Sequence, residues 1–383
     1  MSFSSKDAEF MARALHLARR GVGLVSPGAL VGAVVVKRGK IVGEGFYRYD
    51  RKKHAEVLAI EEAGAKARGA TLYVNLEPCS HWGRTPPCAD LIIQSGIRTV
   101  VSALRDPNPL VSGAGLRKLR AAGVAVKTGS GEEEAAHINE AFVRYMTSKR
   151  PFVALKTAMT IDGKIAQANQ PRGSATWITS EASRKRVHEI RHAHDAILVG
   201  INTILCDDPR LTDRSGHPRR RKLLRVVLDV KLRVPLHSNL VRTAHKDVLI
   251  FCSSRASRRK LRTLEKKGIQ VVSLGDGASG PPRDRGQSMD WNILLRQLGD
   301  REIQSVLIEG GAETNWSAAR AQVVDKFYFF IAPKILGGHH HIPVFGGPGF
   351  NSFNEALRLS QITVERVAED LLVTGYPASD EGM

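Results

Sequence analysis

Four residues of the types that hold and use a metal ion occur near the start of the chain. His54 is followed by Glu56, and Cys79 is followed by Cys88. One imidazole and two thiolates can bind Zn²⁺ tetrahedrally and leave the fourth position open for water. Such a metal lowers the pKa of its water towards neutrality, so that hydroxide can attack an amidine-like ring carbon. Glu56 is then the expected catalytic residue, because a carboxylate there can carry protons from the attacking water to departing ammonia.

The order of these residues is as informative as their types. A His-x-Glu triplet followed by Pro-Cys and a second Cys is typical of zinc deaminases, in which the Glu is not a metal ligand. We therefore predict His54, Cys79 and Cys88 as zinc ligands. The alternative is a structural zinc, which would need a fourth protein ligand such as His81. No unassigned cysteine is near, so the pattern favours a catalytic zinc.

Strands and helices alternate around these residues in a way that would bring them together. A strand over Thr71–Leu76 would deliver Cys79 just beyond its end, and Cys88 precedes a helix over Ala89–Gln94. His54 begins a helical stretch that reaches about Lys66. The alternation predicts an α/β domain with a largely parallel sheet. Strand ends and helix starts are where such sheets build their sites.

Other elements of the first half follow from local signals. Ser4-x-x-Asp7 resembles a capping box before an apolar helix, and Glu132–Met146 is expected to be one helix. The apolar runs Val31–Val36 and Ile41–Phe46 are predicted strands joined by a tight turn.

The pattern starts again near Pro151, which predicts two domains, 1–147 and 148–383. Gly275–Gln287 is rich in turn residues and is expected to be a loop inside the second domain. The predicted strands of this domain are Phe152–Thr157, Ala196–Val199, Val226–Leu228, Val248–Phe251, Val271–Ser273, Ser305–Ile308 and Lys326–Ile331.

Composition sets the broad class of the protein. The 383 residues are 42% hydrophobic and 25% charged, which is ordinary for a globular protein. No apolar run approaches the roughly 20 residues of a membrane span, and the N-terminal residues have no apolar signal core. The four cysteines form no disulfide framework, and thiolate ligands suit a reduced compartment. We expect a cytoplasmic enzyme that binds no membrane.

The net charge of +19 is the most unusual global property. It is compatible with nucleic-acid binding, but the charge is dispersed. The densest basic runs, 218–222 and 255–260, are not interleaved with aromatic residues. A positive field also favours anionic phosphorylated substrates. A solvated basic surface is therefore the preferred interpretation, and nucleic acid is not an expected partner.

Two histidine patterns invite a second metal interpretation. His188-Glu189-Ile190-Arg191-His192 matches the metalloprotease His-Glu-x-x-His motif on a predicted helix. No Gly-x-x-His continuation follows, and the chain leads directly into a strand, so we do not assign a protease. His339–His341 lies in a glycine-flanked stretch and is expected to be loop surface.

The segment between the two predicted cysteine ligands is more specific than the ligands themselves. Leu76–Cys88, with its Gly-Arg-Thr-Pro-Pro run, and Asp106–Pro109 resemble the bifunctional riboflavin-biosynthesis deaminase–reductase family, RibD. The resemblance implies a cytidine-deaminase-like α/β domain that deaminates 2,5-diamino-6-ribosylamino-pyrimidinone 5′-phosphate hydrolytically. It also implies that Arg84 and Thr85 bind substrate, with His81 nearby. Gly28-Ala29 stands where the family has Asn-Pro, so a substrate-contacting amide is missing.

The second half contains a strand ending in Gly310-Gly311 before a helix, which presents backbone N–H groups to a phosphate. The resemblance to RibD continues here through Lys156–Lys164, Trp177–Ser180, Gly200–Thr212 and Ile331–Gly338. It implies a dihydrofolate-reductase-like α/β domain that uses NADPH to reduce the ribosyl group to ribityl. The residues implied at the NADPH site are Trp177, Thr203, Asp207, Gly311, Ala312, Glu313, Thr314, Asn315, Trp316 and Ser317. Those implied to face the substrate are Lys156, Arg191, Leu211, Arg214 and Glu309.

The leading prediction is a two-domain riboflavin-biosynthesis enzyme, a zinc-dependent hydrolase joined to an NADPH-dependent oxidoreductase. Its partner would be a phosphorylated pyrimidine, and we expect a homo-oligomer. One rival is a zinc deaminase acting on a nucleobase in RNA, with the basic second half as a binding domain. Another is a regulatory or RNA-binding protein with a degenerate site, although His54, Glu56, Cys79 and Cys88 are all retained. NADPH binding would separate these, because a nucleic-acid module has no use for it.

Overall fold

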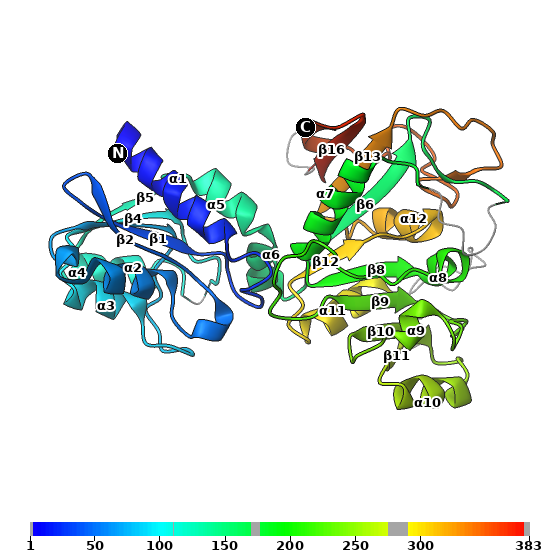
Figure 1. Cartoon of the computed structure of the whole chain (residues 1–383), viewed down its shortest axis with the longest axis horizontal. Coiled ribbons are helices and arrows are strands. Elements are labelled where there is room, and N and C mark those ends of the chain that lie inside the picture. Colours follow the sequence, from blue (N-terminus) through cyan, green and yellow to red (C-terminus); the bar gives the residue numbers. More distant parts are fainter. Residues whose placement is uncertain (1–2, 110, 170–176, 275–289, 379–383) are drawn as a thin grey trace. The chain divides into compact units, whose positions relative to one another are not determined.

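The structure is a computed structural model that describes residues 3–109, 111–169, 177–274 and 290–378. The predicted loop 275–287 lies outside the described residues. The chain forms two compact units (Figure 1). The first comprises Met1–Lys149 together with Pro218–Arg221, and the second comprises Arg150–His217 and Lys222–Met383.

The first unit contains a five-stranded sheet in the order β2-β1-β3-β4-β5. Its strands are β1 (Gly32–Lys37), β2 (Lys40–Phe46), β3 (Thr71–Leu76), β4 (Thr99–Leu104) and β5 (Ala125–Thr128). β3, β4 and β5 are parallel, but β1 is antiparallel to both β2 and β3. The prediction of a largely parallel sheet is confirmed for β2, β3, β4 and β5, which run in one direction, and only β1 is reversed. The reason is the tight turn at Arg38-Gly39, which folds β1 and β2 into a hairpin.

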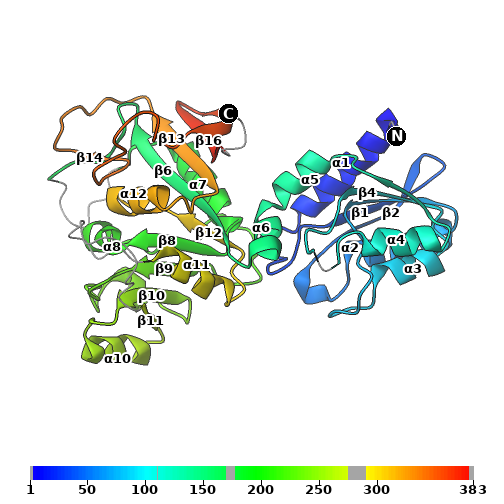
Figure 2. The ribbon, with the colours of Figure 1, turned by 180° about the vertical axis from the view of Figure 1, so that it is seen from behind.

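Helices cover both faces of this sheet (Figure 2). They are α1 (Ser5–Arg19), α2 (Ala55–Ala63), α3 (Cys88–Gln94), α4 (Ala114–Ala121), α5 (Glu132–Ile138) and α6 (Glu140–Ser148), with short 3₁₀ turns η1 (Tyr49–Arg51) and η2 (Gly64–Ala67). Side chains of α1 and α5 pack in one buried cluster, and those of α2, α3 and α4 pack in another.

Two local predictions at the ends of this unit have different outcomes. The capping box is confirmed: Ser4 Oγ accepts the Asp7 N–H at 3.1 Å, and Asp7 Oδ2 accepts the Ser4 N–H at 3.0 Å. The single helix over Glu132–Met146 is wrong, because it breaks at Asn139 between α5 and α6. The Asn139 amide instead binds both the N–H and the carbonyl of Leu30.

The second unit contains a nine-stranded sheet in the order β11-β10-β9-β8-β12-β6-β13-β16-β15, and β7 and β14 form a small separate pair. Its strands are β6 (Phe152–Thr160), β7 (Lys164–Ala166), β8 (Ala196–Gly200), β9 (Leu224–Leu228), β10 (Val248–Ser253), β11 (Gln270–Leu274), β12 (Ser305–Ile308), β13 (Lys326–Ala332), β14 (Ile342–Pro343), β15 (Leu359–Val367) and β16 (Asp370–Pro377). All seven strands predicted for this half are confirmed. The antiparallel hairpin of β15 and β16 was not predicted.

Most helices of the second unit contribute to one of two buried clusters. The helices of this unit are α7 (Glu181–His192), α8 (Ile201–Asp207), α9 (Asn239–Arg242), α10 (Arg258–Lys266), α11 (Trp291–Gly299) and α12 (Ala312–Arg320). α11 and α12 contribute to one cluster, and α8, α9 and α10 contribute to the other. Within the described part of the chain, no helix is long and apolar enough to span a membrane.

Candidate active sites

The predicted zinc ligands converge in the first unit. His54 is the N-cap residue of α2, Cys79 follows β3, and Cys88 is the first residue of α3. His54 Nδ1 lies 3.1 Å from Cys88 Sγ and 3.5 Å from Cys79 Sγ. Tetrahedral zinc with bonds of roughly 2.0–2.3 Å places its ligand atoms roughly 3.5–3.8 Å apart. The 3.5 Å pair matches this spacing and the 3.1 Å pair is shorter, so a small outward movement of Cys88 Sγ would let this donor set hold the ion.

Close packing of α2 on the sheet fixes the position of the first ligand. A Cβ atom on Gly43 would lie 2.1 Å from the Ala59 carbonyl oxygen, and one on Gly45 would lie 2.3 Å from that of Ala55. Only glycine at these positions of β2 lets α2 approach so closely. The absence of side chains at Gly43 and Gly45 therefore allows the close packing that fixes the position of α2, and with it that of His54 at the N-terminus of the helix.

The metal-type group contains three residues and no fourth. Among the described residues it consists of His54, Cys79 and Cys88, and His81 is not a member. The hydrogen bond from Cys88 lowers the pKa of Cys79 to about 4, with His54 adding to the effect and burial opposing it. The same hydrogen bond, together with burial, raises the pKa of Cys88. Both sulfurs have to be deprotonated to bind zinc, so metal binding would release the remaining proton.

Glu56 lies in the first turn of α2, beside the metal-type group, and is only 3% exposed. Burial raises the pKa of its carboxyl, the Cys79 thiolate adds to this, and His54 opposes it. A carboxyl whose pKa is moved towards neutrality is suited to accept and return protons.

The implied substrate contacts Thr85 and Arg84 have different surroundings. The Thr85 hydroxyl is 3.2 Å from His54 Nε2, on the ring nitrogen that does not face the cysteines. The exposed Arg84 guanidinium stacks 3.7 Å above the ring centroid of Tyr49. Tyr47 meets the His54 ring edge-on, with centroids 5.4 Å apart. Neither tyrosine was predicted as a site residue, because neither belongs to a sequence motif.

Glu77 is a further residue that the sequence analysis did not single out. It is 5% exposed, and its two carboxylate oxygens accept four backbone N–H groups. Two of these, from Gly115 and Leu116, lie in the first turn of α4, whose N-cap residue Gly113 has no capping side chain. Glu77 thus caps α4 from a distant strand and ties that helix to the segment that carries Cys79.

In the second unit, three of the implied substrate residues form a buried ionic triad. Glu309 follows β12, and its carboxylate oxygens lie 2.5 and 2.9 Å from Nε and Nη2 of Arg191 on α7. Lys156 Nζ on β6 lies 3.3 Å from the same carboxylate. Burial alone would raise the pKa of Glu309, but Arg191 and Lys156 hold it well below its usual range.

The other implied substrate residues have different surroundings. Leu211 packs in the buried cluster of α8, α9 and α10 and has a left-handed φ of 54°. Only its main chain is therefore available to a ligand. Arg214 is exposed, and its N–H donates to His188 Nδ1 at 3.3 Å.

The residues implied at the NADPH site lie mostly at the carboxyl ends of β8 and β12. Gly200 and Gly310 both approach Thr314 so closely that a Cβ on either would lie within 2.6 Å of its side chain. Gly311 is the N-cap of α12, and Thr203 and Asp207 lie on α8. The crevice beyond such strand ends is the usual place for a dinucleotide.

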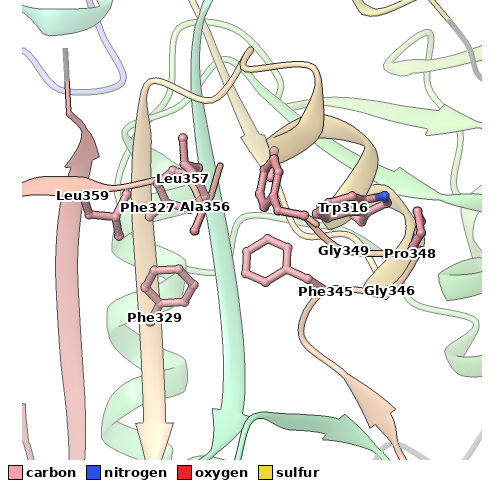
Figure 3. A pocket seen from close by; sticks show the side chains of 13 residues that line it. Trp316, Phe327, Phe329, Phe345, Gly346, Pro348, Gly349, Ala356, Leu357 and Leu359 are labelled. Carbon is pink, nitrogen blue, oxygen red and sulfur yellow. The ribbon is translucent and has the colours of Figure 1, made fainter. Parts of the chain in front are cut away.

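The rest of the run Gly311–Ser317 is less uniform. The Asn315 amide donates to the Val344 carbonyl, and Ser317 Oγ accepts the Trp291 indole N–H. Trp316 lines an apolar pocket of about 420 Å³ with Phe327, Phe329 and Phe345, as Figure 3 shows. The side chains of Asn315, Trp316 and Ser317 are thus engaged in contacts within the second unit. Trp177 is 59% exposed, and the Arg184 guanidinium lies 4.7 Å above its ring.

Neither histidine pattern forms a metal-type group among the described residues. His192 Nδ1 lies 2.8 Å from Asp213 Oδ2, and His188 accepts the Arg214 N–H. Burial, with Arg191 and Arg214 adding to it, lowers the pKa of His188 to about 4. His341 accepts the Ala168 N–H. The motif on α7 is therefore used for packing and hydrogen bonding.

Comparison with known proteins covers both halves of the chain. The family model of the cytidine and deoxycytidylate deaminase zinc-binding region matches residues 4–104, and that of the RibD C-terminal domain matches residues 151–373. The riboflavin biosynthesis protein RibD of Aquifex aeolicus is 43% identical over 367 residues, covering 96% of this chain and 97% of its own. RibD of Escherichia coli is 38% identical over 344 residues, covering 87% and 89%.

Solved structures resemble the whole chain as well. Acinetobacter baumannii RibD superposes with a TM-score of 0.85 at 33% identity and covers 98% of this chain and 99% of its own. A Thermotoga maritima diaminohydroxyphosphoribosylaminopyrimidine deaminase/5-amino-6-(5-phosphoribosylamino)uracil reductase gives 0.82 at 39% identity and covers 97% and 99%.

The predicted fold class is confirmed, with a cytidine-deaminase-like α/β domain followed by a dihydrofolate-reductase-like one. The predicted cofactors, Zn²⁺ and NADPH, are confirmed with it, and the RNA-directed rival is not favoured. The chain belongs to the RibD family of riboflavin-biosynthesis deaminase–reductases.

Proposed function

We propose that this bifunctional riboflavin-biosynthesis enzyme carries its deaminase in residues 1–147 and its reductase in residues 148–383. The substrate of the first reaction is 2,5-diamino-6-ribosylamino-pyrimidinone 5′-phosphate, and the second reduces the ribosyl group of the product to ribityl. The observation that carries the proposal is the convergence of His54, Cys79 and Cys88 beside the buried Glu56.

In the deaminase, His54, Cys79 and Cys88 would hold the zinc. When bound, the ion supplies Lewis acidity that activates a water molecule at neutral pH. Glu56 accepts a proton from that water and returns it to the leaving amine, so that ammonia departs as a neutral molecule. Thr85 accepts the Nε2–H of His54 and holds the imidazole in the tautomer whose Nδ1 faces the cysteines. Arg84 contributes positive charge towards the phosphorylated substrate.

In the reductase, the nicotinamide supplies the hydride to C1 of the ribosyl group. The cofactor site would be lined by Gly311, Thr314, Thr203, Asp207 and Trp177. The helix α12 beside this site would be shaped by Ala312, Glu313, Asn315, Trp316 and Ser317. Arg191 and Lys156 bind and orient the sugar phosphate, and Glu309 fixes both cations in place. Lys156 is the ammonium of this triad and so the group that can donate a proton as the sugar ring opens. Arg214 and the main chain of Leu211 complete the substrate side.

We also propose that the enzyme is a homo-oligomer that pairs through β15. This strand is the last in the nine-stranded order, and its Ile362 and Val364 side chains are 57% and 63% exposed. An exposed edge strand that carries apolar side chains is prone to pair with another chain, and a second copy presents the same edge. Light scattering of the wild type and of Ile362→Lys would test this, and a monomeric wild type would contradict it.

A cytoplasmic location is proposed from the chemistry of the first site. Cys79 and Cys88 have to remain reduced to bind zinc, which a reducing compartment ensures. Fractionation of cells that express the tagged protein would test this.

The two activities can be tested separately with the purified full chain. The aminated pyrimidine and the already deaminated pyrimidine are supplied in turn, and ammonia release and NADPH consumption are followed. Ammonia and NADPH consumption from the first, and NADPH consumption alone from the second, are expected. NADPH consumption with only the deaminated compound would contradict the deaminase assignment and leave the reductase assignment intact.

A further inference from the structure

One aromatic ring of the first unit carries two arginine side chains. The guanidinium carbon of Arg84 lies 3.7 Å from the ring centroid of Tyr49, and that of Arg220 lies 3.5 Å from it. Two groups so close to one centroid cannot share a face, so the ring lies between them. We name this group of Tyr49, Arg84 and Arg220 the Arg–Tyr–Arg stack.

Arg220 reaches the stack through a segment of the chain that is distant in sequence. Pro218–Arg221 belongs to the first unit, and the Arg220 N–H donates to the Gly23 carbonyl at 2.8 Å. The Arg220 guanidinium also donates through Nη1 to the Ser26 carbonyl. This contact lies two residues before Gly28, where the family has a substrate-contacting asparagine. The stack is therefore built beside the position that lacks the amide.

The charge of the stack is not neutralised by protein groups. Among the described residues, no carboxylate forms an ion pair with Arg84 or Arg220, whereas neighbouring Arg48 pairs with Asp50 at 2.8 Å. Stacking on tyrosine stabilises each cation modestly, but the two like charges repel one another. An anion at the edge of the ring would accept hydrogen bonds from both guanidinium groups. A phosphate has the oxygen acceptors and the negative charge that two guanidinium groups recognise.

The stack is adjacent to the reacting centre without being part of it. Arg84 immediately precedes Thr85, whose hydroxyl contacts His54 Nε2 at 3.2 Å. Tyr49 is two residues beyond Tyr47, whose ring meets that of His54 edge-on. An anion bound to the stack would therefore lie near the metal-type group but separated from it. In the substrate, the 5′-phosphate is likewise separated from the pyrimidine ring by the ribose.

We propose that the Arg–Tyr–Arg stack binds the 5′-phosphate of the deaminase substrate. The inference rests on the deaminase function proposed above. It assigns Tyr49 and Arg220 as specificity-determining residues for that reaction. It also makes a segment from the second half of the sequence a necessary part of the first site.

The first experiment measures anion binding without turnover. The zinc-loaded full chain is treated with phenylglyoxal, which modifies accessible arginines, and the modified residues are located by mass spectrometry. Ribose 5-phosphate should slow the modification of Arg84 and Arg220 several-fold, whereas ribose should not. Protection of neither residue by ribose 5-phosphate would overturn the proposal, even if the enzyme proves to act on another substrate.

The second experiment measures the contribution of Arg220 to catalysis. Arg220→Ala should raise the deaminase KM for the phosphorylated substrate about 10- to 100-fold, the range for a lost charge-assisted hydrogen bond. It should leave the KM for the dephosphorylated substrate unchanged. Arg220→Lys, which keeps the charge, should restore part of the difference. Lys222→Ala removes the same charge two residues away and is the matched control.

Each outcome of the kinetic experiment either supports the proposed role of Arg220 or overturns it. Equal losses on both substrates would show that Arg220 only supports the fold, and an unchanged KM would show that it has no role; both overturn the proposal. Zinc content and deamination of the dephosphorylated substrate by Arg220→Ala, measured in the same preparation, report whether the first unit of the variant is folded. A wild type that deaminates neither substrate would refute the deaminase assignment, and the protection experiment would still decide the stack.

Discussion

The Thr85 hydroxyl lies 3.2 Å from Nε2 of His54, while Nδ1 of the same ring lies 3.1 Å from Cys88 Sγ. The two ring nitrogens therefore have different partners. An Nε2–H that donates to Thr85 leaves the lone pair of Nδ1 directed at the cysteines, which is the tautomer that a metal ligand needs.

Thr85→Val tests this orientation, because it keeps the shape of the side chain and removes the acceptor. We expect zinc affinity to fall about 10- to 100-fold, as for other outer-shell partners of metal-bound histidine. Competition with a chromogenic chelator measures the affinity, and Thr128→Val on β5 is the control. Unchanged zinc affinity in Thr85→Val would show that the hydroxyl contacts substrate only.

Glu56→Gln separates proton transfer from metal binding. The amide fills the same buried position but cannot accept a proton, so deamination should fall by about 10²–10⁴-fold. Zinc content by elemental analysis and NADPH consumption with the deaminated pyrimidine should both stay close to wild type. A variant that retains deamination would exclude Glu56 as the proton carrier.

Glu77→Gln tests the cap that joins α4 to the Cys79 segment. The carboxylate of Glu77 accepts hydrogen bonds from backbone N–H groups, whereas the amide NH₂ of glutamine is itself a donor and would face those N–H groups without bonding to them. The free energy of unfolding of the first unit should therefore fall by about 2 kcal/mol. Urea denaturation followed by far-ultraviolet circular dichroism measures this. Glu62→Gln is the control, because its carboxylate accepts a single exposed N–H, from Glu44. Equal effects of the two substitutions would argue against a special role for Glu77.

Glu309→Gln breaks the ionic triad of the second unit. It leaves Arg191 and Lys156 buried without their counter-ion, and we expect a loss of about 3–5 kcal/mol in the free energy of unfolding. Reduction of the deaminated pyrimidine should fall with it. Arg186→Gln, which breaks an exposed ion pair with Glu189 on the same α7, is the control and should change stability little.

The same triad predicts a pH dependence. Because folding lowers the pKa of Glu309, its stabilisation is present in full above the unfolded value of about 4.3 and is lost as the pH falls towards the folded value. The difference in unfolding free energy between wild type and Glu309→Gln should therefore be constant near neutrality and shrink below about pH 4. A difference that grows on acidification would contradict the assignment.

Gly28 is constrained by a neighbour that the sequence did not reveal. A Cβ there would lie 2.9 Å from the Val25 carbonyl oxygen and 3.0 Å from the Tyr47 ring. Restoring the family residues with Gly28→Asn and Ala29→Pro should therefore fail to raise deaminase turnover while Tyr47 occupies the space. Adding Tyr47→Ala should recover only part of the thermal stability lost on Gly28→Asn, because the close contact with the Val25 carbonyl oxygen remains. Increased turnover in the first variant alone would show that Tyr47 moves aside.

Much of the fold could be read from local patterns. Thr71–Leu76 and the seven strands of the second half are apolar runs between turn residues, and the structure has strands at each of them. The hairpin of β15 and β16 was missed because half of β15 is polar and exposed, so its pattern does not mark a buried strand. The direction of β1 was also missed, since an apolar run carries no information about which neighbour it pairs with or in which sense.

For the sites, the sequence by itself determined the chemistry: an imidazole, two cysteines and a glutamate at spacings typical of a zinc deaminase, followed by a second domain of reductase type. Only the tertiary structure decided what surrounds those groups. Glu77, Tyr47, Tyr49 and Arg220 belong to no motif, and Arg220 is separated from Tyr49 by much of the chain. The physical reason is that ligand identity is a property of residue type, whereas capping, stacking and ion pairing depend on distances that only packing sets.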